Sequence, residues 1–262
     1  MKRYISIYKA FAKMSLETLF AYRANFINSS ISSVAWAIFS FVSIFLLTSK
    51  TSSIYGWKRE EIILLTCGYQ ITIGIFHTLF TANFGRMAEI IEHAQLDGFL
   101  LKPIDSQFIM SMRWVNYTSI FRIFIGIIFL IYILQNFSIG LDPFTIGIFF
   151  LLLLVGLLLL YSIWFTVATM LIWFPRLSNI IDLMFSVSGM TRYPGELYKH
   201  ASEYLFLFLL PITLVVATPV KFLFRRTTVF DILELFIFTL IFFVFSRKFW
   251  KFALRFYTSA SS

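Results

Sequence analysis

Four stretches of this chain contain no charged side chain, and each is long enough to cross the hydrocarbon core of a bilayer as a helix. Such a crossing takes about 20 mostly apolar residues. The longest stretch runs over residues 143–175, and the others cover 24–49, 62–85 and 123–141. We therefore expect the first four membrane spans near residues 25–47, 62–84, 117–136 and 144–172.

The composition leaves few other classes. Charged residues make up 13% of the chain and hydrophobic residues 59%, whereas a soluble domain carries about 25% charge. This excludes a water-soluble globule, and the same apolar content excludes intrinsic disorder. A membrane β-barrel would require strands of alternating polarity in place of continuous apolar runs. The expected class is therefore an all-α integral membrane protein.

Past the fourth span the crossings are harder to count. The apolar stretch 177–190 contains Asp182, and the stretch 204–220 is interrupted by Pro211 and Pro219. The last apolar stretch begins with two acidic side chains. Hydropathy alone therefore allows six or seven spans.

Residues 1–23 have the pattern of an amphipathic helix that lies in the membrane interface. At about 100° per residue the polar side chains form one narrow stripe, and the apolar ones cover the other faces. Basic residues break any apolar core of the length that a signal peptide needs. The alternative is an ordinary basic cytoplasmic tail that fixes the topology. The members of the stripe are Lys2, Ser6, Lys9, Lys13 and Glu17.

Basic residues near the spans predict the orientation. With the N-terminus inside, the first four spans place eight basic residues inside and three outside, and the basic C-terminal tail is also typical of a cytoplasmic segment. Two cytoplasmic ends need an even number of spans, hence six, so residues 204–220 should form a re-entrant element. One observation argues against this topology, because five basic residues of the external segment 191–227 would face outward. They are Arg192, Lys199, Lys221, Arg225 and Arg226.

Motifs of catalysis and nucleotide binding are missing from the sequence. There is no GxxxxGK[ST] loop, no GxGxxG and no HExxH. His77, His93 and His200 are far apart and have no cysteine partner at metal-ligand spacing. Basic cytoplasmic loops explain the net charge of +9 without a nucleic-acid partner. We therefore expect no catalytic residue, no metal and no cofactor in this chain.

The segment between spans two and three, residues 85–108, is the most informative part of the chain. Residues 86–95 have the pattern of a short amphipathic helix, a break follows at Asp97, and Lys102-Pro103 ends the next turn. Such a helix on the cytoplasmic side is suited to docking into a groove of a soluble partner. The alternative is a solvated connector between two spans.

Several short motifs occur in a fixed order along nearly the whole chain. The most specific is Leu96-Asp97-Gly98-Phe99-Leu100-Leu101-Lys102-Pro103. The others are Tyr22-Arg23-Ala24-Asn25-Phe26, Gly56-Trp57 followed by Lys58-Arg59-Glu60-Glu61, Tyr193-Pro194 with Pro211 and Pro219, and the tail Arg255-Phe256-Tyr257-Thr258-Ser259. In these features the chain resembles the permease subunits of ABC-2-type transporters, in particular a branch of similar length whose substrate is unknown. One departure is Ala94, because that branch often has glycine two positions before the leucine.

The resemblance implies a single transmembrane permease domain over residues 1–262. It implies six spans, a cytoplasmic amphipathic N-terminal helix and a pair of short external re-entrant helices between spans five and six. It also implies a coupling helix that contacts a separate cytoplasmic P-loop ATPase subunit, which binds the ATP. Two permease chains, identical or paralogous, would pair with two such subunits. The location implied is the inner (plasma) membrane, surrounded by lipid, with both termini cytoplasmic.

This mechanism assigns roles to individual residues of the coupling segment. Closure of the two ATPase subunits would push the segment, which would transmit the motion to the spans. We expect polar contacts from Glu89, Glu92, Asp97 and Lys102, apolar contacts from Leu96, Phe99 and Leu100, and a turn fixed by Pro103.

Two ionisable side chains inside predicted spans are candidates for the translocation path. A mid-span arginine such as Arg122 costs about 2.5–3.5 kcal/mol on insertion scales, so it should face the path or pair with Asp182. The alternatives are that Arg122 snorkels to the interface and that Asp182 caps a short span.

Two other functions remain open. A stand-alone secondary transporter or channel commonly has broken spans in matched halves, whereas here the proline-broken element occurs only in the second half. A membrane-embedded lipid-modifying enzyme would show clustered acids and histidines near the interface. The substrate is not indicated by the sequence, because lipids, hydrophobic drugs, peptides and glycans all suit an apolar interface.

Overall fold

The computed structural model describes residues 2–49, 53–136, 142–177 and 179–258. Ser259 of the C-terminal motif lies outside them. Five helical stretches in the described part are long and apolar enough to cross a membrane. They are Arg23–Ser49, Arg59–Glu92, Tyr117–Asn136, Pro143–Ile172 and Val229–Ala253. The first four confirm the predicted spans one to four, and the fifth contains the predicted last span, so the chain is an all-α multi-pass membrane protein.

Most of these stretches join several helical elements. The first is α2 (Arg23–Ser49) and the last is α13 (Val229–Ala253). The second consists of α3 (Arg59–Phe76), the π-helical turn η1 (His77–Thr81), α4 (Ala82–Gly85) and α5 (Met87–Glu92). The third is η2 (Tyr117–Ser119) with α8 (Ile120–Asn136), and the fourth is α9 (Pro143–Thr169) with η3 (Met170–Ile172).

The remaining elements are short or lie between the spans. They are α1 (Lys2–Ala21), β1 (Ser53–Ile54), β2 (Trp57–Lys58), α6 (Leu96–Leu100), α7 (Ser106–Met112), α10 (Asn179–Ser188), η4 (Gly189–Arg192), α11 (Gly195–Ala201) and α12 (Glu203–Leu223). The two strands pair antiparallel through a two-residue turn, in which Tyr55 and Gly56 have φ of 50° and 81°. Two central residues with positive φ are the mark of a type I′ hairpin turn.

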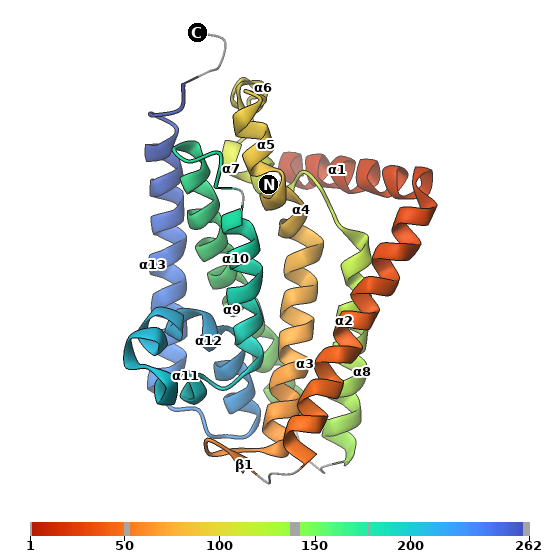
Figure 1. The fold of residues 1–262 in the computed structure, drawn as a ribbon, viewed down its shortest axis with the longest axis vertical. Helices are drawn as coiled ribbons and strands as arrows, with labels where there is room; N and C mark the ends of the chain where they lie inside the picture. The colour runs from red at the N-terminus through yellow and green to blue at the C-terminus, as the bar shows by residue number, and fades with distance from the viewer. Residues whose placement is uncertain (1, 50–52, 137–141, 178, 259–262) are drawn as a thin grey trace.

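The long helices stand side by side and give the molecule two distinct ends (Figure 1). Helix α1 lies across one end, where α5, α6, α7 and the end of α13 are also found. We call this the α1 end. The β-hairpin, α11 and α12 lie toward the opposite end, which we call the hairpin end. The segment after span two is therefore on the same side as the helices at both ends of the chain.

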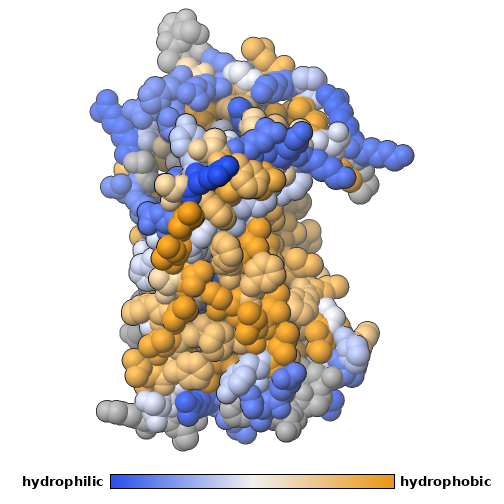
Figure 2. All heavy atoms as spheres, turned by 90° about the vertical axis from the view of Figure 1, so that its right-hand side faces the viewer, coloured by the Kyte–Doolittle hydropathy of each residue, from blue (hydrophilic) through white to orange (hydrophobic). Residues whose placement is uncertain are grey.

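The surface between the two ends is apolar. Figure 2 shows a hydrophobic band across the middle of one face of the molecule, with hydrophilic side chains concentrated above and below it. The long helices carry large exposed apolar side chains, among them Phe39 of α2, Phe124 of α8 and Leu240 of α13. Such a surface is compatible with a lipid bilayer. The backbone hydrogen bonds of a helix are made within the helix, so its outer face needs no polar partner.

The second half of the chain differs from the predicted pattern. Helix α10, in the predicted fifth span, has ten residues and so reaches about 15 Å at 1.5 Å per residue, half the thickness of a bilayer core. Helix α12 has 21 residues and continues through Pro211 and Pro219, where the sequence predicted an interruption. Its apolar part, Leu209–Leu223, is shorter than a span.

Helix α12 packs closely against α9 because of one glycine and one proline. Pro219 has no N–H, so the carbonyl oxygen of Val215, four residues earlier, lacks its usual helical donor. A Cβ placed on Gly156 of α9 would lie only 2.5 Å from that oxygen. Gly156 therefore permits the two backbones to approach, and the proline supplies a carbonyl free of helical bonding at the contact.

Aromatic side chains connect the second span to α9 and α13. Phe84 of α4 lies 5.9 Å from Trp164 and 6.0 Å from Phe165, measured between ring centroids. Phe165 in turn contacts Trp250 of α13 at 5.3 Å. All four rings are buried. Aromatic pairs at such distances add about 0.5–1.5 kcal/mol each beyond burial of their area, so α4 is firmly joined to two other spans.

Candidate functional site

The coupling segment predicted from the sequence forms two short helices, α5 and α6, at the α1 end. Helix α5 ends with the N–H of Gln95 bonded to the carbonyl of Ile90 at 2.9 Å and the N–H of Ala94 bonded to that of Ile91 at 3.2 Å. This is the Schellman pattern, in which the penultimate position is usually glycine. Ala94 occupies that position with φ of 54°. The departure noted in the sequence thus falls at the residue where the backbone is left-handed.

The structure separates the predicted coupling residues into exposed and buried groups. Glu89, Glu92, Lys102, Pro103 and Leu100 are exposed, and Asp97 is half-buried. Leu96 and Phe99 are buried within this chain, so they are not available for the partner contact predicted for them. The reason is that α6 folds back on α7 and turns its apolar side inward. Leu101, 85% exposed, is the apolar side chain that sequence reasoning overlooked.

An asparagine attaches this segment to the linker before span three. Asn83 of α4 is buried, and its amide nitrogen donates to the carbonyls of Leu79 at 2.9 Å and Trp114 at 2.8 Å. Its amide oxygen accepts from the N–H of Trp114 at 2.9 Å. The guanidiniums of Arg86 and Arg113 lie over the Trp114 ring, 4.8 and 4.9 Å from its centroid. The segment is therefore held by a satisfied polar contact and not only by packing.

A second attachment joins the segment to α13. Asp105 caps α7 by accepting from the N–H of Phe108 at 3.0 Å, and it also accepts from Nη1 of Arg247 at 2.8 Å. Partial burial raises the pKa of the Asp105 carboxyl, but the hydrogen bonds from Arg247 and Phe108 outweigh this effect, so the pKa lies below its ordinary value. Burial and the nearby Asp97 carboxylate raise the pKa of the Tyr257 hydroxyl, which places α6 beside the C-terminal residues.

A cavity of about 910 Å³ lies between α2, α3, α8, α10 and α11, and several hydroxyl groups and two arginines line part of its wall. Arg122 lines it, and its Nη1 donates to Nδ1 of His77 at 3.4 Å; the assignment of this cavity to a translocation path stays a prediction. Arg192 of η4 also lines the cavity. Asp182 does not: it is exposed on α10, and no ion pair joins it to Arg122 in the structure. The predicted pairing of these two residues is therefore wrong.

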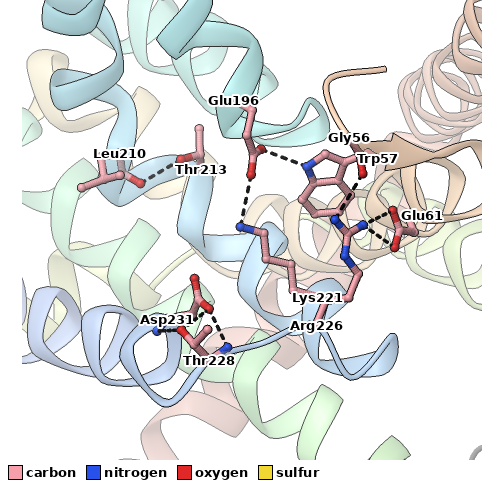
Figure 3. Close-up of polar contacts among 10 residues, drawn as sticks. All are labelled: Gly56, Trp57, Glu61, Glu196, Leu210, Thr213, Lys221, Arg226, Thr228 and Asp231. Atoms are coloured by element: carbon pink, nitrogen blue, oxygen red, sulfur yellow. Dashed lines mark hydrogen bonds and ion pairs between the residues drawn. The ribbon is translucent and has the colours of Figure 1, made fainter. Parts of the chain in front are cut away.

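The hairpin end is held together by ion pairs (Figure 3). Arg226, just after α12, donates to both carboxylate oxygens of Glu61 at 2.7 and 2.6 Å. Glu196 of α11 accepts from the Trp57 indole at 2.9 Å and lies 3.2 Å from the Lys221 ammonium. Lys221 and Arg226, two of the five basic residues that argue against the predicted topology, thus form ion pairs within the chain. The positive-inside rule counts Lys and Arg whether or not they are paired, so these ion pairs explain why the residues are tolerated at this end but leave the objection to the topology in place.

The described residues contain no group of three histidine, cysteine, aspartate or glutamate side chains that could hold a metal ion. The free Cys67 is buried in α3, and His77 belongs to the π-helical turn. Local π-helical turns often mark functional positions in helices, and no periodicity in the sequence revealed this one.

Comparison with known proteins gives a family. Residues 34–261 match a family model described as ABC-2 family transporter protein. Neither the curated proteins nor the solved structures gave a match. The family match covers most of the chain and agrees with the several apolar helices of the fold. Such proteins are the membrane permeases of ABC transporters and in general associate with an ATPase subunit. This chain therefore belongs to the ABC-2 transporter family.

Proposed function

We propose that this chain is an export permease that is driven by a separate cytoplasmic ATPase docking on α5 and α6. The observation that carries the proposal is the position of these helices. They continue directly from span two, they lie at the same end as α1 and the end of α13 (Figure 1), and their charged and apolar tips are exposed. A groove-docking helix needs such a surface together with a firm connection to the spans.

The α1 end is the cytoplasmic end in this proposal. Its helices carry unshielded basic side chains, including Lys2 and Lys9 of α1 and Lys251 of α13, all exposed. An excess of Lys and Arg near the ends of the spans is typical of the cytoplasmic side.

The contact surface consists of one apolar tip and several charges. Leu101 is the most exposed large apolar side chain of the segment, and Leu100 is 38% exposed. Glu89, Glu92 and Lys102 of the same segment are also exposed. A small apolar centre with a polar rim is the usual arrangement of an interface, so Leu101 and Leu100 would enter the groove and the charges would set specificity.

The route of transmission runs through buried rings. A push on α5 and α6 moves α4, because the second span is continuous from Arg59 to Glu92. Phe84 of α4 then moves Trp164 and Phe165 of α9, and Phe165 moves Trp250 of α13. Packed interiors transmit displacement because they have few voids. ATPase closure would thereby shift α9 and α13 and open the permease toward the outside.

The six-span topology belongs to this proposal. Helix α10 would serve as a short fifth crossing together with η4, and α11 with α12 would re-enter from the outer side, held by the ion pairs of the hairpin end. A second permease chain, identical or paralogous, would complete the path. The membrane would be the cell's inner (plasma) membrane.

The orientation can be tested with a pair of cysteine variants. Cys67 is fully buried and gives little background. We expect Lys102→Cys at the α1 end to react with a membrane-impermeant maleimide only after the cells are permeabilised. The matched variant Lys58→Cys, exposed at the hairpin end, should react in intact cells. Reversed labelling would overturn the proposal, because α5 and α6 would then face outward.

The partner can be tested by co-purification. The tagged chain, purified from its own membranes in a mild detergent, should carry vanadate-sensitive ATP hydrolysis. The charge reversal Glu92→Lys should remove this activity from the eluate, whereas Glu17→Lys, an exposed reversal on α1, should retain it. ATP hydrolysis that is absent from the wild-type eluate, or unaffected by Glu92→Lys, would contradict the assignment and favour a stand-alone transporter.

A further inference from the structure

The cavity lined by Arg122 has an unusual charge balance for the interior of a membrane protein. Its lining includes Arg122 and Arg192 and contains no aspartate or glutamate. Neither guanidinium forms an ion pair among the residues that the structure describes. An intramembrane arginine is costly and is normally compensated by a partner. The cavity therefore has two positive charges that no carboxylate of this chain neutralises.

Buried hydrogen-bonding groups in the same cavity also lack partners. Gln70 of α3 is 0% exposed, and neither its amide nitrogen nor its amide oxygen has a hydrogen-bond partner in the structure. The Nε atoms of Arg122 and Arg192 are likewise buried without a partner. An unsatisfied buried polar group costs about 1–3 kcal/mol. Three such groups facing one space indicate a site that is complete only when something polar occupies it.

The two guanidiniums line the same cavity, together with Tyr69 of α3. The planar guanidinium donates in a fork that fits phosphate or carboxylate oxygens, and it is weakly hydrated. Two such forks in one cavity favour an anion, because a cation would be repelled and a neutral group would leave the charges unpaired.

The cavity opens beside an apolar surface. Trp36 of α2 lines it and is 61% exposed, and a shallow apolar depression next to it shares Trp36 and Ser32 and includes Phe39. On its face toward the cavity, α2 contributes the hydroxyl-bearing residues Ser29, Ser33 and Ser40 to the lining. Helix α2 therefore presents hydroxyls to the cavity and large apolar side chains to the lipid at its mouth.

We propose that this cavity binds the anionic head group of an amphipathic molecule, with Arg122 and Arg192 on the head group and the apolar tail along α2 at Trp36. A phosphate or carboxylate would satisfy both guanidiniums and leave Gln70 to bond a neighbouring polar atom. The inference deepens the proposed export function by giving its substrate class. The site itself is a property of this chain and does not need the ATPase.

The proposal can be tested by ligand binding to the purified full-length chain in phosphatidylcholine nanodiscs without any ATPase. Radiolabelled dodecyl phosphate serves as the probe, because it has an anionic head and one tail. We expect saturable binding. Arg122→Gln and Arg192→Gln should each weaken it at least tenfold, whereas Arg176→Gln, an exposed arginine outside the cavity lining, should leave it unchanged.

Two competitors separate the head group from the tail. Unlabelled dodecylphosphocholine has the same tail but a zwitterionic head and should compete poorly. Inorganic phosphate has no tail and should also compete poorly. Effective competition by inorganic phosphate would show a site for a soluble anion, and effective competition by dodecylphosphocholine would show a tail site without charge selection. Either result would overturn the proposal.

The variant Gln70→Leu provides a second test of the site in case an arginine variant fails to fold. This change removes the unpartnered amide, so thermal stability should be kept or improved while dodecyl phosphate binding falls severalfold. Unchanged binding in Gln70→Leu and in both arginine variants would overturn the site. If the probe binds as expected but no ATPase activity co-purifies with the chain, the proposed function fails and the binding site stands.

Discussion

The carboxylates of Glu61 and Glu196 at the hairpin end differ from those of α5 in whether they are paired within the chain. At the hairpin end the carboxylates of Glu61 and Glu196 are matched with Arg226 and Lys221 inside the chain. At the α1 end Glu89 and Glu92 of α5 are exposed, and no ion pair of the structure involves them. The hairpin end is thus stabilised by its own contacts, whereas the α5–α6 surface retains charges for a partner.

The first prediction has the largest expected effect and removes an ion pair of the hairpin end. Arg226→Ala should destabilise the protein by about 3 kcal/mol, because it leaves the buried Glu61 carboxylate without its cation. Thermal or denaturant unfolding of the purified chain in detergent measures this. Arg225→Ala, at the adjacent exposed position, should cost less than about 0.5 kcal/mol. The double variant with Glu61→Gln should recover part of the loss. Equal costs for both arginines would contradict the comparison.

The second prediction concerns the exposed α5–α6 surface at the α1 end. Leu101→Asp should weaken ATPase association by about 2 kcal/mol, roughly 30-fold, because it places a charge in the apolar centre of the contact. The free energy of unfolding of the chain should stay within about 0.5 kcal/mol, since the side chain is 85% exposed. Leu101→Met keeps an apolar tip and should bind normally. A large loss of stability in Leu101→Asp would show that this surface is packed within the chain.

The spans could be predicted from the sequence, because exclusion of charge from the bilayer is a local rule that acts on every residue of a long helix. The inward turn of Leu96 and Phe99 could not. A five-residue helix has too little length for its periodicity to define a face, and the packing of α6 on α7 decides which side is buried. The exposed Leu101 follows from the same tertiary contact.

The cavity could not be predicted from the sequence either. Arg122 stood out as an ionisable residue in a span, but Arg192 was counted only as a charge of an external loop. The two line one space because α8 and η4 both pack near α3, although 70 residues separate them in the chain. Ala94 stood out in the sequence only as a departure from the usual glycine, and the left-handed bend that the structure has there was not predicted.

The third prediction concerns that bend. Ala94→Gly should stabilise the chain by about 1 kcal/mol, because Ala94 has φ of 54° and the left-handed region costs a residue with a Cβ about 1–2 kcal/mol. Part of this gain is offset by the greater freedom of glycine in the unfolded chain. Ala88→Gly, in the body of α5, should instead destabilise by about 1 kcal/mol. Unfolding curves measure both, and a loss of stability in Ala94→Gly would disprove the strain.

The smallest effect is a pH dependence at the α1 end. Asp105 has a pKa below its ordinary value because Arg247 and the Phe108 N–H bond its carboxylate. The ionised carboxylate should therefore contribute fully to the free energy of unfolding above the pKa of an unfolded aspartate, about 3.9. This contribution should be lost as the pH falls through the lower pKa of the folded state. Since the pair is partly exposed, the contribution is about 0.5 kcal/mol.

Asp105→Asn isolates that charge, because asparagine also caps helices well and so retains the bond to Phe108. The difference in melting temperature between the wild type and Asp105→Asn should be constant from pH 7 to about pH 5 and should narrow toward pH 3. A difference that is independent of pH would mean that the carboxylate acts only as a helix cap. In that case the charge of Asp105 would not fasten the coupling segment to α13, and uncharged contacts such as the hydrogen bond from the Trp250 indole to Ser106 at 3.0 Å would hold the two together.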